Sequence, residues 1–314
     1  MENFFRIIDM ILPVFIIMGI GFLGKKARLF SESFLMSASR LVFNVFLPIN
    51  LFMNIYNAEG IEQVELPLVL YCISALIGIV IVFYLIYRKM GFPLEERAIM
   101  IQTLSRSNIV LFGLSLAGNY FNAEALALIS IYIGIISAFS NGFSVLIYEV
   151  LLGGERGFDI FRIVKAVLKN AVFIAALAGI FVNISGADLY KPLWTAGNDL
   201  AGIASPLGLI CIGGTMNFDS QEGERRALWT TVVSKAVIIP VVMLSLFVSI
   251  GVRGPELFVM MIIFAAPAAV TTHAMSVIYT SKCELCGKII VYTTLLNSLT
   301  IFLSMYLLTT MGLL

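Results

Sequence analysis

The chain has 314 residues, of which 60% are hydrophobic and 12% are charged, and its mean hydropathy is +1.00. Soluble domains contain about 45–50% apolar and about 25% charged residues, so this composition excludes a water-soluble domain and indicates an all-α integral membrane protein. A net charge of +1 offers no basic face for nucleic acid, and four cysteines are too few for a disulfide framework.

A transmembrane helix needs about 20 mostly apolar residues, and ten segments of the chain meet this requirement. In chain order they are 5–24, 34–55, 67–88, 97–119, 124–150, 170–186, 195–216, 227–250, 255–279 and 287–311. The cluster Lys25, Lys26 and Arg28 follows the first segment instead of preceding it, so this segment is not a cleavable signal peptide. Residues 151–169 form the one long connection, which we expect to be a cytoplasmic linker with an amphipathic helix.

The distribution of basic residues predicts the orientation of the chain. The loops after the odd-numbered segments hold 14 of the 20 lysines and arginines, whereas the opposite loops hold only Arg6, Lys191 and Arg253. Because cytoplasmic loops are enriched in basic residues, both termini should be extracytoplasmic. We therefore expect a multi-pass protein of the cell membrane (inner or plasma membrane).

The spacing of helix-breaking residues predicts an internal repeat. Pro48 and Pro206, in segments two and seven, are 158 residues apart, and Asn108 and Pro267, in segments four and nine, are 159 apart. A constant offset of half the chain indicates two five-helix repeats, 1–150 and 170–314. Because five is odd, the second repeat must be inverted, as in many secondary transporters.

The fourth segment carries the polar stretch LSRSNIV at its centre. Ser and Asn are preferred helix N-caps, so this stretch predicts a helix that ends near Ser105 and restarts near Ser107 and Asn108. A restarted helix directs free N–H groups and a partial positive charge toward the membrane midplane. The alternative is that these side chains only bond to neighbouring helices.

The ninth segment contains AAPAAVTTH, in which Pro267 cannot donate to the helix ladder. We expect a second break here, crossing the first at the midplane and forming an anion site. The alternative is a tolerated kink. The candidate substrate ligands are Arg106, Ser107, Asn108, Pro267, Ala268 and Thr271, with Pro48 and Asn50 from the second segment.

Three basic residues lie within segments and one histidine follows the second break. Arg106 is costly at this depth, by about 2.5–3.5 kcal/mol, so it should bind an anion, substitute for a bound cation, or reach the membrane edge. His273 is the sole histidine and either carries a proton or fills a packing role. Arg40 and Lys235 are interpreted as interfacial.

Other chemistry has little support in the sequence. Cys283 and Cys286 form a lone CxxC without a second ligand pair, so no zinc or other metal site is predicted. No P-loop or other cofactor motif is present, and no nucleophile has an obvious partner base, so we do not expect an enzyme.

Four stretches resemble the auxin efflux carrier family, the bacterial relatives of the plant PIN carriers. They are RLVFNVFLPINLFMNIY, SNIVLFGLSLA, IASPLGLICIGGTMNF and FAAPAAVTTHAMSVIY, and together they extend the resemblance over essentially the whole chain. In the plant carriers a Pro-Asn pair forms the crossing in helix four. Asn108 matches the Asn, whereas Ser107 replaces the Pro and Ser115 replaces a second usual Pro.

The resemblance implies a scaffold domain from segments 1, 2, 6 and 7 and a transport domain from segments 3–5 and 8–10. It also implies a homodimer through the scaffold and an approach of the fifth segment to the site, where Ser137, Ser140 and Asn141 are the nearest matches. The substrate would be a small organic anion, such as malate, malonate or an auxin-like acid, moved by an elevator mechanism.

Two alternative functions remain open from the sequence. One is a sodium-coupled organic-anion symporter of the bile-acid type, which shares the architecture but needs carboxylate and amide oxygens where this chain has Arg106. The other is a non-transporting membrane receptor on the same fold. The sequence leaves the substrate, the direction of transport and the coupling ion open.

Overall fold

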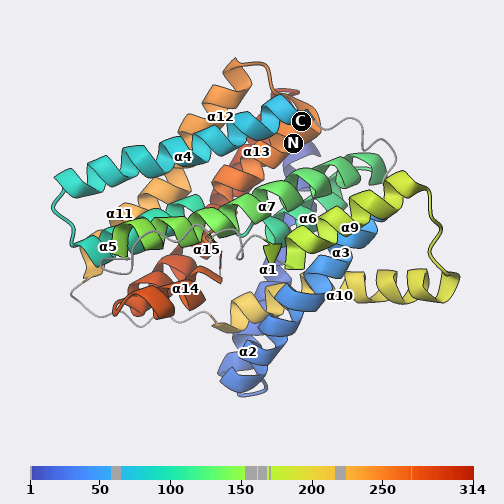
Figure 1. Ribbon diagram of the computed structural model, residues 1–314, viewed down its shortest axis with the longest axis horizontal. Coiled ribbons are helices and arrows are strands. Elements are labelled where there is room, and N and C mark those ends of the chain that lie inside the picture. Colours follow the sequence, from blue (N-terminus) through green and yellow to red (C-terminus); the bar gives the residue numbers. More distant parts are fainter. Residues whose placement is uncertain are drawn as a thin grey trace. The chain divides into compact units, whose positions relative to one another are not determined.

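The computed structural model describes residues 2–57, 65–152, 161, 168–169, 171–215, 224–269 and 271–314. Within these ranges the chain forms helices and no β-strand, which confirms the all-α prediction (Figure 1). Extended backbone pairs at one isolated bridge, between Ser107 and Ala268. Most of the predicted linker 151–169, with its amphipathic helix, lies outside the described residues.

The helices follow one another along the chain, with short π-helical turns, denoted η, between some of them. They are α1 (Glu2–Lys26), α2 (Glu32–Leu41), η1 (Val42–Phe46), α3 (Leu47–Tyr56), α4 (Leu66–Lys89), α5 (Leu94–Ser105), α6 (Ile109–Tyr120), α7 (Ala123–Leu152), α9 (Ala171–Ser185), α10 (Lys191–Thr215), α11 (Arg225–Val233), η5 (Ser234–Ile238), α12 (Ile239–Ser249), α13 (Gly254–Ala265), α14 (Thr271–Tyr279) and α15 (Cys283–Thr310).

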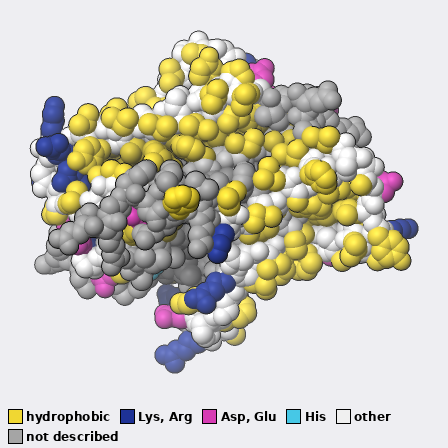
Figure 2. All heavy atoms as spheres, viewed as in Figure 1, with side chains coloured by type: hydrophobic (Ala, Val, Ile, Leu, Met, Phe, Trp, Pro, Cys, Tyr) yellow, Lys and Arg dark blue, Asp and Glu magenta, His cyan; other side chains and the backbone are white. Residues whose placement is uncertain are grey.

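Six helices within the described residues are long and apolar enough to cross a membrane. They are Glu32–Tyr56, Leu66–Lys89, Ala123–Leu152, Lys191–Gly214, Arg225–Ser249 and Cys283–Thr310. Figure 2 shows hydrophobic side chains over much of the visible face, as expected for a surface that contacts lipid. The count of ten spans and their arrangement as inverted repeats stay predictions.

The chain divides into two compact units. Unit 1 comprises Met1–Val64, Val110–Ala138 and Leu168–Met216, and unit 2 comprises Glu65–Ile109, Phe139–Val167 and Asn217–Leu314. The sequence repeats and the scaffold and transport domains stay predictions.

Close helix packing in unit 1 depends on glycine. In the pair formed by α1 and α10, a Cβ atom at Gly213 would overlap the main-chain oxygen of Met18, and one at Gly21 would overlap that of Ile210. Small residues allow two membrane helices to approach until their backbones touch, which maximises van der Waals contact where lipid offers no hydrophobic driving force.

In unit 2, one end is held by charged contacts between loops and helix starts. The Lys282 ammonium donates to the Glu96 carboxylate in the first turn of α5, and Ser281 donates to Glu95 at 2.7 Å. The hydrogen bond to Glu96 raises the pKa of Lys282 above its usual value. These contacts tie the turn between α14 and α15 to the start of α5.

Candidate substrate site at the crossing of two broken helices

The helix break expected within residues 97–119 is present, and no proline causes it. Helix α5 ends at Ser105, α6 begins at Ile109, and Arg106 between them is extended, with φ −117° and ψ 100°. Hydroxyls bond to carbonyls near the end of α5: Thr103 donates to Ile99 O at 2.9 Å, and Ser105 donates to Gln102 O at 3.0 Å, which also accepts the Arg106 N–H at 3.2 Å. Such local bonds are typical of Ser and Thr near helix ends.

The break within residues 255–279 is also present and is caused by Pro267. Helix α13 ends at Ala265 and α14 begins at Thr271. Since Pro267 has no N–H, the carbonyl of Ile263, four residues earlier, loses its helical donor. The Ser107 hydroxyl replaces that donor at 2.6 Å. A side chain of the first break therefore repairs the hydrogen bond that the second break removes.

The two extended segments, 106–108 and 266–269, pair with each other, and we call this pair the crossover. The Asn108 N–H donates to Pro267 O at 2.8 Å, and the Ala269 N–H donates to Arg106 O at 3.0 Å. These two bonds flank the antiparallel bridge between Ser107 and Ala268. Non-helical backbone at membrane depth is tolerated only with such partners. Both extended segments lie in unit 2.

Near the end of each helix that enters the crossover, α5 and α13, one carbonyl lacks its usual helical N–H donor, because that N–H bonds across the crossover. Asn108 N–H bonds to Pro267, so Leu104 O loses its donor, and the Lys235 ammonium bonds to it at 2.9 Å. In the same way Ala269 N–H bonds to Arg106, so Ala265 O is released, and the Asn297 amide donates to it at 2.8 Å. The helix ends are thus closed by buried side chains from other helices.

Lys235 is carried by the π-helical turn η5. Ile239 N–H bonds to Ser234 O instead of Lys235 O, and Pro240 has no N–H for Ala236 O. Helix α15 supplies both missing donors: Asn297 bonds to Lys235 O at 3.2 Å and Thr300 bonds to Ala236 O at 2.6 Å. This turn places Lys235, which is 1% exposed, with its ammonium 2.5 Å from Ser107 Oγ.

Two side chains of the crossover have hydrogen-bonding capacity that the described residues leave unused. Asn108 is 4% exposed, and its Nδ2 has no hydrogen-bond partner in the part of the chain that the structure describes. The half-buried Arg106 guanidinium makes its one hydrogen-bond contact there with the Met275 thioether, at 3.1 Å. Gln102 Oε1, on the preceding helix turn, is likewise buried and unbonded. The Asn108 amide and the Arg106 guanidinium are donors that suit a small anion, whereas Gln102 Oε1 is an acceptor.

The other predicted site residues are distributed over both units. Thr271 begins α14, and the His273 ring lies against Gly287 of α15. Pro48 and Ser137 belong to unit 1, as does Asn50, whose amide donates to Ala201 O of α10 at 3.1 Å. The Asn141 side chain lies outside the described residues. The crossover therefore unites five predicted residues: Arg106, Ser107, Asn108, Pro267 and Ala268.

The interfacial interpretation of Lys235 was wrong, and Thr293 and Asn297 were missed. Lys235 is buried in the middle of Arg225–Ser249, whereas Arg40 is exposed as expected. Thr293 accepts the Ala268 N–H at 3.3 Å. The polar residues 293, 297, 300 and 304 recur at helical spacing in an apolar segment, and this signal could have revealed a face turned toward protein.

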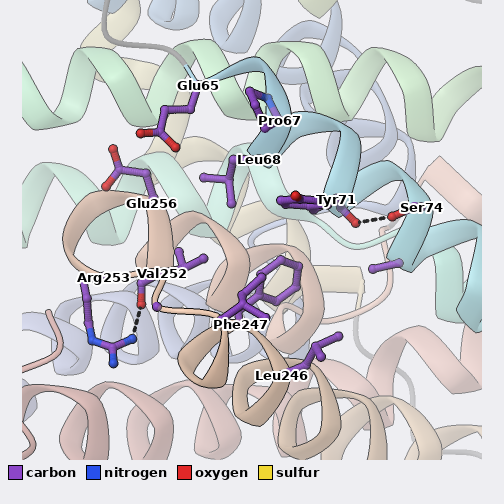
Figure 3. A pocket seen from close by; sticks show the side chains of 13 residues that line it. Glu65, Pro67, Leu68, Tyr71, Ser74, Leu246, Phe247, Val252, Arg253 and Glu256 are labelled. Carbon is purple, nitrogen blue, oxygen red and sulfur yellow. Dashed lines mark hydrogen bonds between the residues drawn. The ribbon is translucent and has the colours of Figure 1, made fainter.

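A separate cavity of about 780 Å³ lies in unit 2, between the start of α4 and the turn from α12 to α13 (Figure 3). Leu68, Tyr71 and Phe247 form its apolar lining, and two carboxylates, Glu65 and Glu256, and the Arg253 guanidinium also line it. None of the predicted site residues lines this cavity. Among the described residues, no three His, Cys, Asp or Glu side chains cluster as metal ligands would.

The comparison with known proteins concerns the first half of the chain. The family model described as "Membrane transport protein" matches residues 6–152, which is slightly under half of the chain and includes the first broken helix. No curated protein matches the chain. The family match confirms the resemblance to the auxin efflux carrier family over residues 6–152.

Proposed function

We propose that the protein is a secondary transporter of small organic anions, with mono- or dicarboxylates such as malate or malonate as substrates. Two observations carry this proposal: the Asn108 amide nitrogen is buried without a hydrogen-bond partner among the described residues, and the Arg106 guanidinium belongs to the same extended segment, two residues earlier. An N–H donor and a fixed positive charge together match the two hydrogen-bonding needs of a carboxylate.

The starts of the outgoing half-helices support the same substrate class. Helix α6 begins at Ile109, immediately after Asn108, and α14 begins at Thr271. Helix N-termini carry free N–H groups and about half a positive charge, which favours anions. The location of the whole crossover within unit 2 supports an elevator mechanism, in which one compact unit carries the site across the membrane.

Carboxylate uptake into proteoliposomes tests the proposal. The Asn108→Ala variant should lose about ten- to hundredfold in substrate affinity, because a hydrogen bond to a charged group contributes about 1.5–3 kcal/mol. The matched control is Asn198→Ala in α10, where the amide donates to Trp194 O of its own helix at 2.9 Å. This control should transport like the original protein.

Three results would contradict the proposal in different ways. Equal affinities for the Asn108→Ala and Asn198→Ala variants would remove Asn108 from the site. Strict dependence of uptake on sodium would favour a symporter of the bile-acid type. Substrate binding without any flux would favour a membrane receptor.

A further inference from the structure

The C-terminal end of α5 is closed by a lysine side chain inside the protein. The Lys235 ammonium bonds to Leu104 O at 2.9 Å and to Ser107 Oγ at 2.5 Å, and the side chain is 1% exposed. Among the described residues, no carboxylate forms an ion pair with Lys235. Its charge is therefore balanced by main-chain and hydroxyl oxygens alone.

Those oxygens are the ones that an inorganic cation would use. The C-terminal end of a helix carries about half a negative charge, concentrated on its unbonded carbonyls. In transporters with interrupted helices, such carbonyls coordinate sodium ions or protons at the midplane. The carbonyl and hydroxyl oxygens that contact the Lys235 ammonium are of the same chemical types as the oxygen ligands of a bound monovalent cation.

The two helix ends differ in the charge of the side chain that closes them. At the end of α13, the neutral Asn297 amide donates to Ala265 O, whereas at the end of α5 the donor is a lysine. Burial of an ammonium costs several kcal/mol unless its partners compensate, so a neutral amide would be the cheaper way to satisfy a carbonyl. Hydrogen bonding to Leu104 O alone therefore does not require the charge that a lysine provides.

We propose that the Lys235 ammonium is the resident cation of the crossover, held at the end of α5 in place of a dissociable monovalent cation. The role as substitute cation, which the sequence suggested for Arg106, then belongs to Lys235, and Arg106 remains available to the anion. As a statement about coupling, this rests on the proposed function: a covalently attached cation makes carboxylate transport independent of sodium.

Replacement of Lys235 by a small residue should leave an empty cation site where the ammonium was. The test measures the unfolding temperature of the purified full chain in detergent, without substrate, in sodium, potassium, methylammonium or choline chloride at equal ionic strength. The original protein should be equally stable in all four salts. The Lys235→Ala variant should be less stable in choline chloride, and sodium or methylammonium should raise its unfolding temperature in a concentration-dependent way.

The Lys235→Met variant separates charge from packing, because methionine fills similar space but is neutral. It should be less stable than the original protein in every salt, whereas Lys235→Arg should remain folded. Lys191→Ala, at the exposed start of α10, is the control and should respond to no cation.

The proposal is overturned if Lys235→Met is as stable as the original protein, or if no cation stabilises a folded Lys235→Ala variant. If Lys235→Ala does not fold, the comparison of the Arg and Met variants decides: equal stability of these two overturns it. Because the readout uses no substrate, absence of carboxylate flux would refute the proposed function without affecting this result.

Discussion

Adjacent threonines on α15 allow the contribution of a single crossover hydrogen bond to be measured. Thr293 and Thr294 are both buried, and each donates to the carbonyl four residues earlier, Ile289 O at 2.6 Å and Ile290 O at 2.7 Å. Only Thr293 also accepts the Ala268 N–H, at 3.3 Å. The Thr293→Val and Thr294→Val variants therefore lose the same hydroxyl from neighbouring positions, and they differ in the bond to Ala268 and in a second, longer contact of Thr293 with Ile290 O at 3.1 Å.

The geometry sets the size of the expected difference. Ala268 is 1% exposed, so without Thr293 its N–H is left buried and unbonded. An orphaned buried donor costs about 1–3 kcal/mol. A donor–acceptor distance of 3.3 Å is longer than the usual range, so we expect the lower end, about 1 kcal/mol. Loss of the bond within α15 is common to both variants and cancels in the comparison.

Equilibrium unfolding of both variants in detergent, followed by far-UV circular dichroism, measures this difference. Thr293→Val should unfold with a free energy about 1 kcal/mol lower than that of Thr294→Val. Equal free energies, or a larger loss in Thr294→Val, would show that the Ala268 N–H has no need of Thr293. In that case the assignment of hydrogen-bond partners at the crossover would be wrong.

Two further predictions concern parts of the molecule away from the crossover. Gly213→Ala should lower the free energy of unfolding by about 1–3 kcal/mol, because the added methyl group meets the backbone of Met18. The control is Gly202→Ala in the same helix, where the methyl group meets nothing within 4 Å and should not change the free energy of unfolding. Equal losses in the two variants would contradict this prediction. Lys282→Gln should cost less than about 1 kcal/mol at neutral pH, since the ion pair with Glu96 is partly exposed. The raised pKa of Lys282 makes its contribution complete below its usual value of 10.5 and absent once the pH exceeds the raised pKa, so a difference that persists above this pH would contradict the assignment.

The sequence predicted where the helices are interrupted because interruption is a local property. Pro267 removes one donor, and Ser and Asn at positions 105, 107 and 108 favour helix ends, so both breaks leave a signal in the local sequence. The identity of those partners depends on which faces of long helices meet. Lys235 was interpreted as interfacial because a lysine in the first half of a span can extend to the membrane edge. Its contact with Leu104 becomes evident only when η5 and α5 are placed together.

The candidate site was predictable to a similar extent. The matching positions of Asn108 and Pro267 indicated that two breaks belong together, and the structure pairs these two residues directly. The role of Ser107 was not predictable, because it repairs a hydrogen bond lost 156 residues further along the chain, at Ile263. Single-chain periodicity carries no information on such long-range exchanges of partners.

The pairing at the crossover has a consequence for how freely its sequence can vary. Both hydrogen bonds join main-chain atoms, from Asn108 N–H to Pro267 O and from Ala269 N–H to Arg106 O. Proline is the one residue that cannot donate such a bond, so it alone is barred at positions 108 and 269 on this ground. Main-chain hydrogen bonds therefore determine the shape of the crossover. The side chains at 106 and 108 can change with the ligand while this main-chain pairing persists.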